Sequence, residues 1–257
     1  MPHVQEVPSG KVYGRVWRLG RHRLVCGDCT DPAIVALALA GVTPRLMVTD
    51  PPYGVSYDPA WRDDPRLKPF IGEKRAKVAT GKVWNDDRAD WAEAWALFPG
   101  DVAYVWHSSL HHGEVERGMN AAGFNVRSQI IWDKCRLVIS RGHYHWRHEP
   151  CLYAVRKGRT AGWAGDRKQV TVWPIPHRRN ASGHAAEKPL LCMSRPIANH
   201  TALGDWVYDP FLGSGTTLIA AETMGRRCAA VEIDPSHCAL AIGRWEEVSG
   251  SKAEVEA

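Results

Sequence analysis

The sequence predicts an α/β protein built on a mostly parallel β-sheet with helices on both faces. Short apolar runs alternate along the chain with segments of helical periodicity, and this alternation is typical of strand–helix–strand units. Hydrophobic residues make up 44% and charged residues 24% of the 257 residues, which is ordinary globular composition. With no internal repeats or low-complexity segments, the chain is not collagen-like, a long coiled coil or wholly disordered.

The first elements are marked by local signals at their ends. The run from Arg23 to Cys26 is a short apolar strand. Asp31 followed by Pro32 begins a helix, because Asp is a good N-cap and Pro is tolerated at the first helical position. That helix ends near Gly41, a residue type suited to a helix C-terminus. The next strand, residues 45–49, runs directly into the sequence Asp-Pro-Pro-Tyr.

The remaining elements follow from periodicity and from glycine or proline at their ends. Pro196 is expected to kink or shorten the helix that contains it. The expected strands are residues 23–26, 45–49, 102–106, 126–132, 151–155, 206–208 and 228–233. The expected helices are residues 31–41, 90–98, 115–122, 187–201, 218–224 and 235–250.

Apolar stretches and cysteine usage indicate a cytoplasmic protein without a membrane partner. The longest uncharged apolar stretch, residues 32–44, is shorter than the roughly 20 residues that span a bilayer. The N-terminus lacks a signal-peptide pattern, and seven scattered cysteines suggest no disulfide framework. We expect no metal site, and we interpret the cluster of His143, His145 and His148 as polar or nucleic-acid-facing.

Positive charge is concentrated between Arg141 and His184. This segment holds nine Lys/Arg and two acidic residues, whereas the whole chain has a net charge of +5. Such a block is typical of a surface that faces phosphates, and a solvated basic face is the alternative. A second charged segment, residues 54–83, has no clear period, so we expect a mobile loop there.

A glycine-rich turn stands between the strand that ends near Tyr208 and the following helix. Gly213 and Gly215 leave backbone N–H groups bare at this turn, but the third glycine of a dinucleotide fingerprint and the lysine of a P-loop are both absent. Glu232 ends the next strand, where an acid can accept both hydroxyls of an adenosine ribose. The pattern indicates a cofactor with adenosine but no pyrophosphate; a purely structural tight turn is the alternative.

The sequence Asp50-Pro51-Pro52-Tyr53 lies at the carboxyl end of a predicted strand, the edge where open α/β sheets bind ligands. Its two prolines remove two N–H donors, so mainly acceptors remain: the Asp50 carboxylate and the backbone carbonyls. A rigid pair of acceptors suits an exocyclic amino group on a planar ring, and Tyr53 can stack on such a ring. A proline-rich turn at the end of the strand is the alternative.

Taken together, the two motifs resemble those of the β class of DNA amino-methyltransferases, which use S-adenosylmethionine. Asp-Pro-Pro-Tyr is similar to the catalytic motif of that family, and Asp209-Pro-Phe-x-Gly-x-Gly-Thr is similar to its cofactor motif. The catalytic motif comes first, which is the order that the β class shows. Weaker resemblances lie at Gly27-Asp28, Asn85-Asp86-Asp87, His148-Glu149-Pro150 and Glu187-Lys188-Pro189.

This resemblance implies a Rossmann-like methyltransferase fold with a mostly parallel seven-stranded sheet. It implies one domain over residues 13–250, with a DNA-facing loop at 54–83 and a small target-recognition insertion at 156–184. The tails are then residues 1–12 and 251–257, and we expect the second tail to fray. Double-stranded DNA is the implied partner, and a homodimer is expected.

The resemblance also implies residue roles. A base flipped out of the duplex would present its amino group to Asp50 and to the Pro51 carbonyl, and the methyl group of S-adenosylmethionine would move directly to that nitrogen. The implied catalytic residues are Asp50, Pro51, Pro52 and Tyr53. The implied cofactor-binding residues are Asp28, Lys188, Pro189, Asp209, Phe211, Gly213, Ser214, Gly215, Thr216 and Glu232. The implied DNA-binding residues are Arg156, Lys157, Arg159, Arg167, Lys168, Arg178 and Arg179.

Several alternatives stay open on the sequence. In this family Asp50 favours adenine N6 as the acceptor, but the same motif can hold the N4 amino group of cytosine. More remote alternatives are a nicotinamide oxidoreductase, which Gly213, Gly215 and Glu232 alone would permit, and an inactive DNA-binding module. The sequence identifies neither the recognition site nor a companion restriction enzyme.

Overall fold

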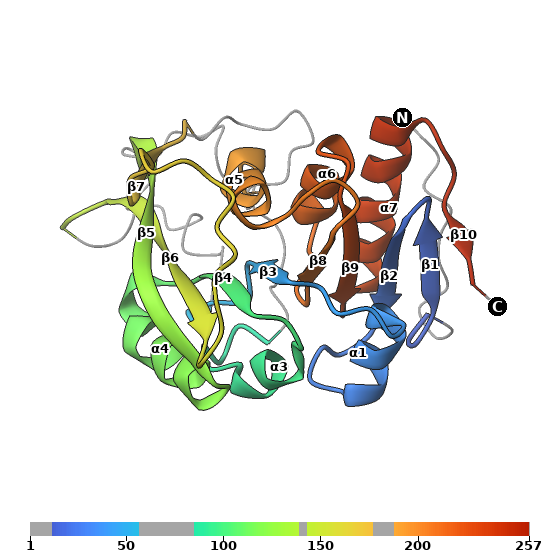
Figure 1. The fold of residues 1–257 in the computed structure, drawn as a ribbon, viewed down its shortest axis with the longest axis horizontal. Coiled ribbons are helices and arrows are strands. Elements are labelled where there is room, and N and C mark those ends of the chain that lie inside the picture. The colour runs from blue at the N-terminus through green and yellow to red at the C-terminus, as the bar shows by residue number, and fades with distance from the viewer. Residues whose placement is uncertain (1–11, 57–84, 139–142, 177–187, 257) are drawn as a thin grey trace, which may run out of the picture.

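The computed structural model describes residues 12–56, 85–138, 143–176 and 188–256. Its described strands form one ten-stranded sheet in the order β10-β1-β2-β9-β8-β3-β4-β6-β5-β7 (Figure 1). The strands are β1 (Val16–Leu19), β2 (His22–Cys26), β3 (Leu46–Thr49), β4 (Val102–Trp106), β5 (Phe124–Val138), β6 (Trp146–Arg156), β7 (Val172–Pro174), β8 (Trp206–Asp209), β9 (Arg227–Glu232) and β10 (Glu254–Val255).

The seven strands expected from the sequence are the central seven of this sheet. Strands β2, β9, β8, β3 and β4 pair in parallel, and β6 and β5 continue the sheet in antiparallel pairing. Three short strands that the sequence did not predict extend the edges: β1 and β10 on one side and β7 on the other. The mostly parallel α/β sheet is therefore confirmed.

Helices cover both faces of the sheet (Figure 1). On one face α1 (Pro32–Leu39), α3 (Ala92–Leu97) and α4 (His112–Ala121) share a buried core with β2, β3, β4 and β9. On the other face α5 (Leu190–His200) packs against β3 and β4, and α6 (Thr216–Thr223) and α7 (Pro235–Ser249) pack against β2 and β9. One turn of 3-10 helix, η3 (Ser109–His111), precedes α4.

Helix ends follow the sequence signals closely, with two differences. Asp31 caps α1 by accepting a hydrogen bond from the Ala33 N–H at 2.8 Å, but the C-cap is Ala40, which takes the left-handed conformation at φ 46° beside Gly41. Helix α5 begins at Leu190 and runs four residues past Pro196. The expectation that Pro196 shortens this helix is therefore wrong, and Pro196 is a buried residue within α5. The alternative expectation, a kink at Pro196, stays a prediction.

The expectation that residues 251–257 fray is also wrong. Glu254 and Val255 form β10, which pairs with β1, and Glu256 makes an ion pair with Arg23 at 2.8 Å. The edge strand β1 offers unpaired backbone groups, and the tail satisfies them. At the other terminus, Val12 is buried against the same end of the core, and the rest of that tail lies outside the described residues.

The antiparallel pair β5–β6 is longer than the sequence predicted. Strand β4 ends at Trp106, which pairs with Cys151. Strand β6 begins five residues earlier, at Trp146, so the β5–β6 hairpin continues beyond the carboxyl ends of the parallel strands. A register irregularity lies between Asp133 and Val138, and Cys135 there has φ 55°.

In the described part of the chain, no helix is both long enough and apolar enough to cross a membrane.

Candidate active site

The Asp-Pro-Pro-Tyr motif follows β3 at the carboxyl edge of the sheet, and neighbouring groups hold its backbone in place. The Asp86 carboxylate accepts hydrogen bonds from three successive N–H groups, those of Tyr53 at 3.1 Å, Gly54 at 3.0 Å and Val55 at 3.3 Å. The indole N–H of Trp91 donates to the Pro52 carbonyl at 3.2 Å. The predicted loop 54–83 otherwise lies outside the described residues.

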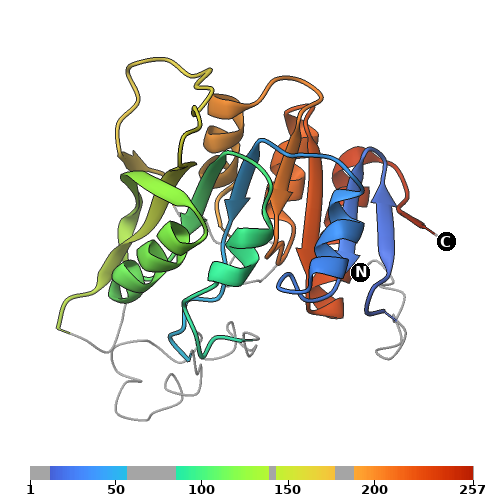
Figure 2. The ribbon, with the colours of Figure 1, turned by 60° about the horizontal axis from the view of Figure 1, so that its bottom comes forward.

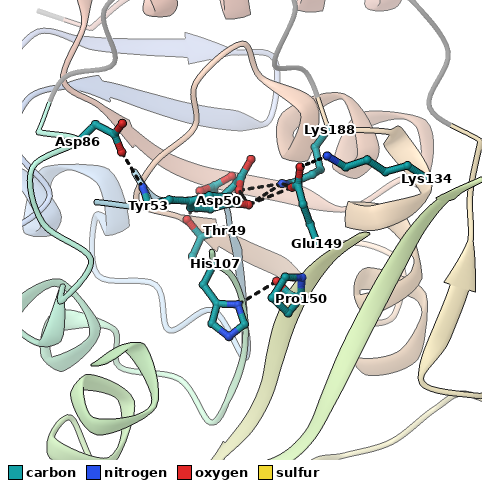
Figure 3. A network of polar contacts seen from close by, with 10 residues as sticks. Thr49, Asp50, Tyr53, Asp86, His107, Lys134, Glu149, Pro150 and Lys188 are labelled. Atoms are coloured by element: carbon teal, nitrogen blue, oxygen red, sulfur yellow. Dashed lines mark hydrogen bonds and ion pairs between the residues drawn. The ribbon is translucent and has the colours of Figure 1, made fainter. Parts of the chain in front are cut away.

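The Asp50 carboxylate lies in a cluster of charged groups (Figure 3). Its Oδ1 accepts the Tyr53 hydroxyl at 2.7 Å and faces the Lys188 ammonium at 3.0 Å. Lys188 also forms an ion pair with Glu149, and Lys134 pairs with the other oxygen of that carboxylate at 2.5 Å. Two ammonium groups and two carboxylates therefore alternate from Lys134 to Asp50.

Burial and charge together set the ionisation of this cluster. Burial raises the pKa of Asp50 above its ordinary value, and the Lys188 ammonium partly opposes this shift. Burial also acts to raise the pKa of Glu149, but the ammonium groups of Lys188 and Lys134 outweigh it and lower that pKa to about 2. The two carboxylates raise the pKa of Lys188, against the effect of its burial. Glu149 and Lys188 are therefore ionised at neutral pH.

Lys188 and Tyr53 both belong to this charged cluster. Lys188 is 7% exposed, and its ammonium contacts the catalytic motif at the Tyr53 hydroxyl, 2.7 Å away, as well as at Asp50. Lys188 therefore contacts the catalytic motif, and its role in cofactor binding stays a prediction. The Tyr53 hydroxyl bonds within the cluster, and the half-buried ring lies 5.3 Å from the Lys188 ammonium.

The glycine turn forms next to this cluster, at the carboxyl end of β8. Gly213 and Gly215 have φ of 55° and 91°, a conformation that favours glycine. The Gly213 N–H donates to one oxygen of the Glu232 carboxylate at 2.7 Å, and the Asp234 N–H donates to the other at 2.8 Å. Each of these oxygens keeps a second lone pair, so Glu232 can still accept hydroxyl groups.

Among the remaining predicted cofactor residues, Phe211, Ser214 and Thr216 belong to this turn or flank it, and Asp28 and Pro189 lie on other elements. Asp28 follows β2, the neighbour of β9, and one of its oxygens accepts the N–H of Thr30 at 2.9 Å. The ring of Phe211 lies edge-on to Trp91, at 4.7 Å between centroids. Thr216 is buried at the start of α6, and Ser214 accepts a hydrogen bond from Arg244 at 2.6 Å through its carbonyl. Pro189 stands directly before α5 as its N-cap residue.

One buried hydrogen bond joins the two motifs. The Thr49 hydroxyl, next to Asp50, donates to Asp209 Oδ1 at 2.7 Å, and the same oxygen accepts the Phe211 N–H at 3.0 Å. Asp209 is 1% exposed, and its burial raises its pKa to about 7 despite these donors. The strand that carries the catalytic motif is thus fixed to the strand that carries the glycine turn.

Asp209→Asn tests this raised pKa. A carboxyl group whose folded pKa exceeds its unfolded value stabilises the fold fully below the unfolded pKa and loses that contribution as pH rises through the folded pKa. We therefore expect wild-type stability to fall by about 4 kcal/mol more than that of the variant between about pH 4 and pH 7. Asn keeps an oxygen that accepts both hydrogen bonds.

The measurement is urea unfolding of both proteins across this pH range, with circular dichroism as the readout. All other titrating groups are common to the two chains, so the difference between their curves isolates Asp209. If stability changed with pH equally in wild type and Asp209→Asn, the raised pKa of Asp209 would be contradicted.

Those predicted DNA-binding residues that the structure describes do not gather at the catalytic edge. Because β6 runs antiparallel to β4, its last residues lie beside Val102, at the opposite edge of the sheet. There the guanidinium of Arg156 donates to the backbone carbonyls of Phe98, Gly100 and Ala122, and Arg159 pairs with Asp101 at 3.7 Å.

The chain after β6 stays near that opposite edge before it returns. Figure 2 shows the loop between β6 and β7 at one end of the molecule and the hairpin end of β5 and β6 at the other. Lys157 is exposed on this loop, as are Arg167 and Lys168, and the loop is tied to the last turn of α5 by a hydrogen bond of 2.7 Å from Gln169 to Asn199. Arg178 and Arg179 lie outside the described residues. A role in DNA binding stays a prediction for all seven residues, and the positions of the five described ones do not favour it.

Three functional candidates were not assigned from the sequence: Glu149, Lys134 and Asp86. Glu149 and Lys134 lie within a hairpin, where no local pattern distinguishes a catalytic charge from a solvated one. The only signals were the weak resemblances at His148-Glu149-Pro150 and Asn85-Asp86-Asp87.

Comparison with known proteins decides the family. The sequence profile described as DNA methylase matches residues 45–243, which include both motifs and the strands between them. The chain belongs to the N6/N4 DNA methylase family. The predicted family is thereby confirmed, and S-adenosylmethionine is the methyl donor of this family.

Relatives within the N6/N4 DNA methylases cover most of the chain. The type II methyltransferase M2.MboI of Moraxella bovis is 25% identical over 222 residues, which are 79% of this chain and 81% of that protein. Among solved structures, the M1.HpyAVI–SAM complex has a TM-score of 0.62 at 20% identity and covers 86% of this chain and 98% of its own. PvuII DNA methyltransferase, described as cytosine-N4-specific, has a TM-score of 0.60 at 14% identity, with 90% and 91% covered. The methyltransferase fold is confirmed.

Proposed function

We propose that this chain is a site-specific DNA methyltransferase that moves the methyl group of S-adenosylmethionine to N6 of an adenine flipped out of double-stranded DNA. One observation carries the proposal: the buried hydrogen bond from Thr49 to Asp209 places the acceptor motif directly beside the glycine turn. A methyl donor held at that turn and an amino group held at Asp50 would then be neighbours.

The catalytic motif supports chemistry at an amino group. An exocyclic amino nitrogen is a weak nucleophile because its lone pair is shared with the ring. Asp50 Oδ2 and the Pro51 carbonyl can accept its two N–H groups and draw them out of the ring plane, which returns the lone pair to nitrogen. With S-adenosylmethionine bound, the nitrogen lone pair would form the new bond to the methyl carbon as the carbon–sulfur bond breaks, and the sulfonium would leave as the neutral thioether S-adenosylhomocysteine. The extra proton on the nitrogen would then pass to the Asp50 carboxylate or to water.

Lys188 and Glu149 support this role of Asp50. The Lys188 ammonium, 3.0 Å from Asp50 Oδ1, favours the ionised form of a carboxylate that burial makes harder to ionise. Glu149 balances part of the positive charge of Lys188, so the cluster is close to neutral. Because the cluster is already assembled, little reorganisation is needed as positive charge develops on the amino nitrogen.

The glycine turn fits an adenosine-containing methyl donor. Residues 213–215 present a bare backbone at the N-terminus of α6, and Glu232 offers carboxylate lone pairs at the end of the neighbouring strand β9. Phe211 adds a half-buried ring at the same place. When bound, S-adenosylmethionine supplies an activated methyl group on a sulfonium.

Adenine is proposed over cytosine because Asp stands first in the catalytic motif. N4-cytosine methylation is the second candidate, since the same acceptors fit that amino group. Assembly as a homodimer also stays a prediction.

The test is direct analysis of the product. The protein is incubated with unmethylated duplex DNA of high sequence complexity and S-adenosylmethionine, and the digested nucleosides are analysed by mass spectrometry. We expect N6-methyladenine. N4-methylcytosine would retain the mechanism and overturn the proposed base, and no methylated nucleoside despite cofactor binding would overturn DNA as the substrate.

A further inference from the structure

The β5–β6 hairpin extends past the catalytic edge of the sheet. We call its outer part, the described residues of 132–148, the arm. Its root lies at the active site: Glu149 belongs to β6 and pairs with Lys134 of β5 and with Lys188. The root is also fixed to the end of β4, because the Pro150 carbonyl accepts hydrogen bonds from the His107 backbone N–H at 3.1 Å and from its Nδ1 at 3.0 Å (Figure 3).

The arm exposes large aromatic and apolar side chains. Tyr144 is 93% exposed, Leu137 60% and Trp146 41%. Trp146 lies opposite Val138 in the register of the hairpin, and its ring meets His148 edge-on at 5.8 Å. Tyr144 lies just before β6, and Trp146 is the first residue of that strand. Exposed aromatic and apolar side chains gathered on one element indicate an interaction site.

The arm is also basic. Among its described residues, Lys134, Arg136 and Arg147 are cationic and Asp133 is the acid. The Arg147 side chain is 63% exposed, and its guanidinium is held by both oxygens of Asp133 at 2.8 and 2.9 Å. Exposed rings combined with arginines suit a nucleic acid, because bases stack on rings and phosphates attract guanidinium groups.

We propose that the arm is a DNA-contacting element of this chain, with Tyr144 and Trp146 stacking on bases beside the extruded one and Arg147 contacting the backbone. The inference rests on the proposed function, because duplex DNA must reach Asp50 at the carboxyl edge. The arm stands at that edge, whereas the loop that carries Lys157 and Arg159 stands at the other edge (Figure 2).

The first test is binding of a fluorescently labelled, random-sequence DNA duplex several helical turns long, followed by anisotropy. For the double variant Tyr144→Ala/Trp146→Ala we expect at least about a tenfold weaker affinity, because base stacking on a ring commonly contributes this much per side chain. The variant Tyr144→Phe/Trp146→Phe should restore binding, since the rings remain. This rescue separates stacking from a purely structural role.

The matched control is Trp163→Ala. Trp163 is 39% exposed, nearly the same as Trp146, but it lies in the loop at the opposite edge. We expect wild-type affinity for this variant. Equal losses from Trp163→Ala and Trp146→Ala would overturn the arm as the DNA contact, as would wild-type affinity of the double alanine variant.

Salt dependence tests the cationic part of the arm. Arg147→Gln should lower the slope of log affinity against log salt by about 0.9, the value for one lost phosphate contact. Arg21→Gln is the control: Arg21 is 49% exposed and faces Glu222 at 3.9 Å, in the β1–β2 turn at the opposite edge. An unchanged slope for Arg147→Gln would overturn the backbone contact.

These results are independent of the product analysis. Failure of wild-type protein to methylate any DNA would refute the proposed function. Methylation by wild-type protein together with full binding by the double alanine variant would refute the arm alone.

Discussion

Asp50→Asn is expected to lower the methylation rate constant kcat by about 10³-fold. Asn keeps an oxygen for the Tyr53 hydroxyl and for Lys188, both of which contact Asp50 Oδ1, so the surrounding loop should stay in place. In place of Asp50 Oδ2, however, the amide of Asn has an NH2 group, which donates hydrogen bonds where the substrate amino group needs an acceptor. The variant therefore loses the interaction that restores the nucleophilicity of the nitrogen.

The measurement is single-turnover methylation of duplex DNA, with S-adenosylmethionine binding measured by calorimetry. We expect cofactor affinity within about twofold of wild type, because the glycine turn and Glu232 do not contact Asp50 through any hydrogen bond of the described residues. Retention of more than a tenth of the wild-type rate, or loss of cofactor binding together with activity, would contradict the assigned role.

Lys188→Met is expected to destabilise the protein by about 3–5 kcal/mol at pH 8. Lys188 is 7% exposed, and its removal leaves Asp50 without a compensating charge and Glu149 with Lys134 alone. Protonation of the carboxylates relieves this penalty, so the destabilisation should shrink as the pH falls toward 4. The same substitution should raise the pKa of Asp50 further. If activity remains, its fall on the acid side of the pH–rate profile should therefore occur at a higher pH than in wild type.

The measurement is urea unfolding at pH 8 and near pH 4 for Lys188→Met and for Lys252→Met. Lys252 forms an ion pair with Glu246 at 2.7 Å, but its side chain is 85% exposed, so its removal should have an effect below about 1 kcal/mol. The double variant Lys188→Met/Glu149→Gln should recover part of the lost stability, since one buried charge is removed with its partner. If Lys188→Met and Lys252→Met lowered the free energy of unfolding equally, the charge of Lys188 would not stabilise the buried cluster.

The catalytic and glycine motifs were predictable because their chemistry is local. Two prolines after Asp50 remove N–H donors whatever surrounds them, and glycine at 213 and 215 permits the positive φ that the turn adopts. Each motif also follows an apolar strand directly, and parallel strands end at a common edge. Residue type and position in the chain were therefore sufficient to bring Asp50 and the glycine turn together.

The charge cluster and the DNA-facing surface were not predictable in this way. Glu149 joins the charged cluster around Asp50 because β6 pairs antiparallel with β4, and this pairing places Cys151 beside Trp106. The same pairing carries Arg156 to the opposite edge, where it caps backbone carbonyls. The described part of the basic segment therefore does not form one basic face, because strand β6 within it runs from the catalytic edge of the sheet to the opposite edge.

The α/β class, the family and the two motifs follow from the sequence alone, because they depend on residue types at strand ends and on short-range backbone preferences. The three-dimensional fold is needed to see which charges surround Asp50, which edge of the sheet the described arginines occupy, and that C-terminal residues complete the sheet as β10. These features depend on strand direction and on register between residues that lie 39 to more than 200 positions apart in the sequence, and no local pattern encodes them.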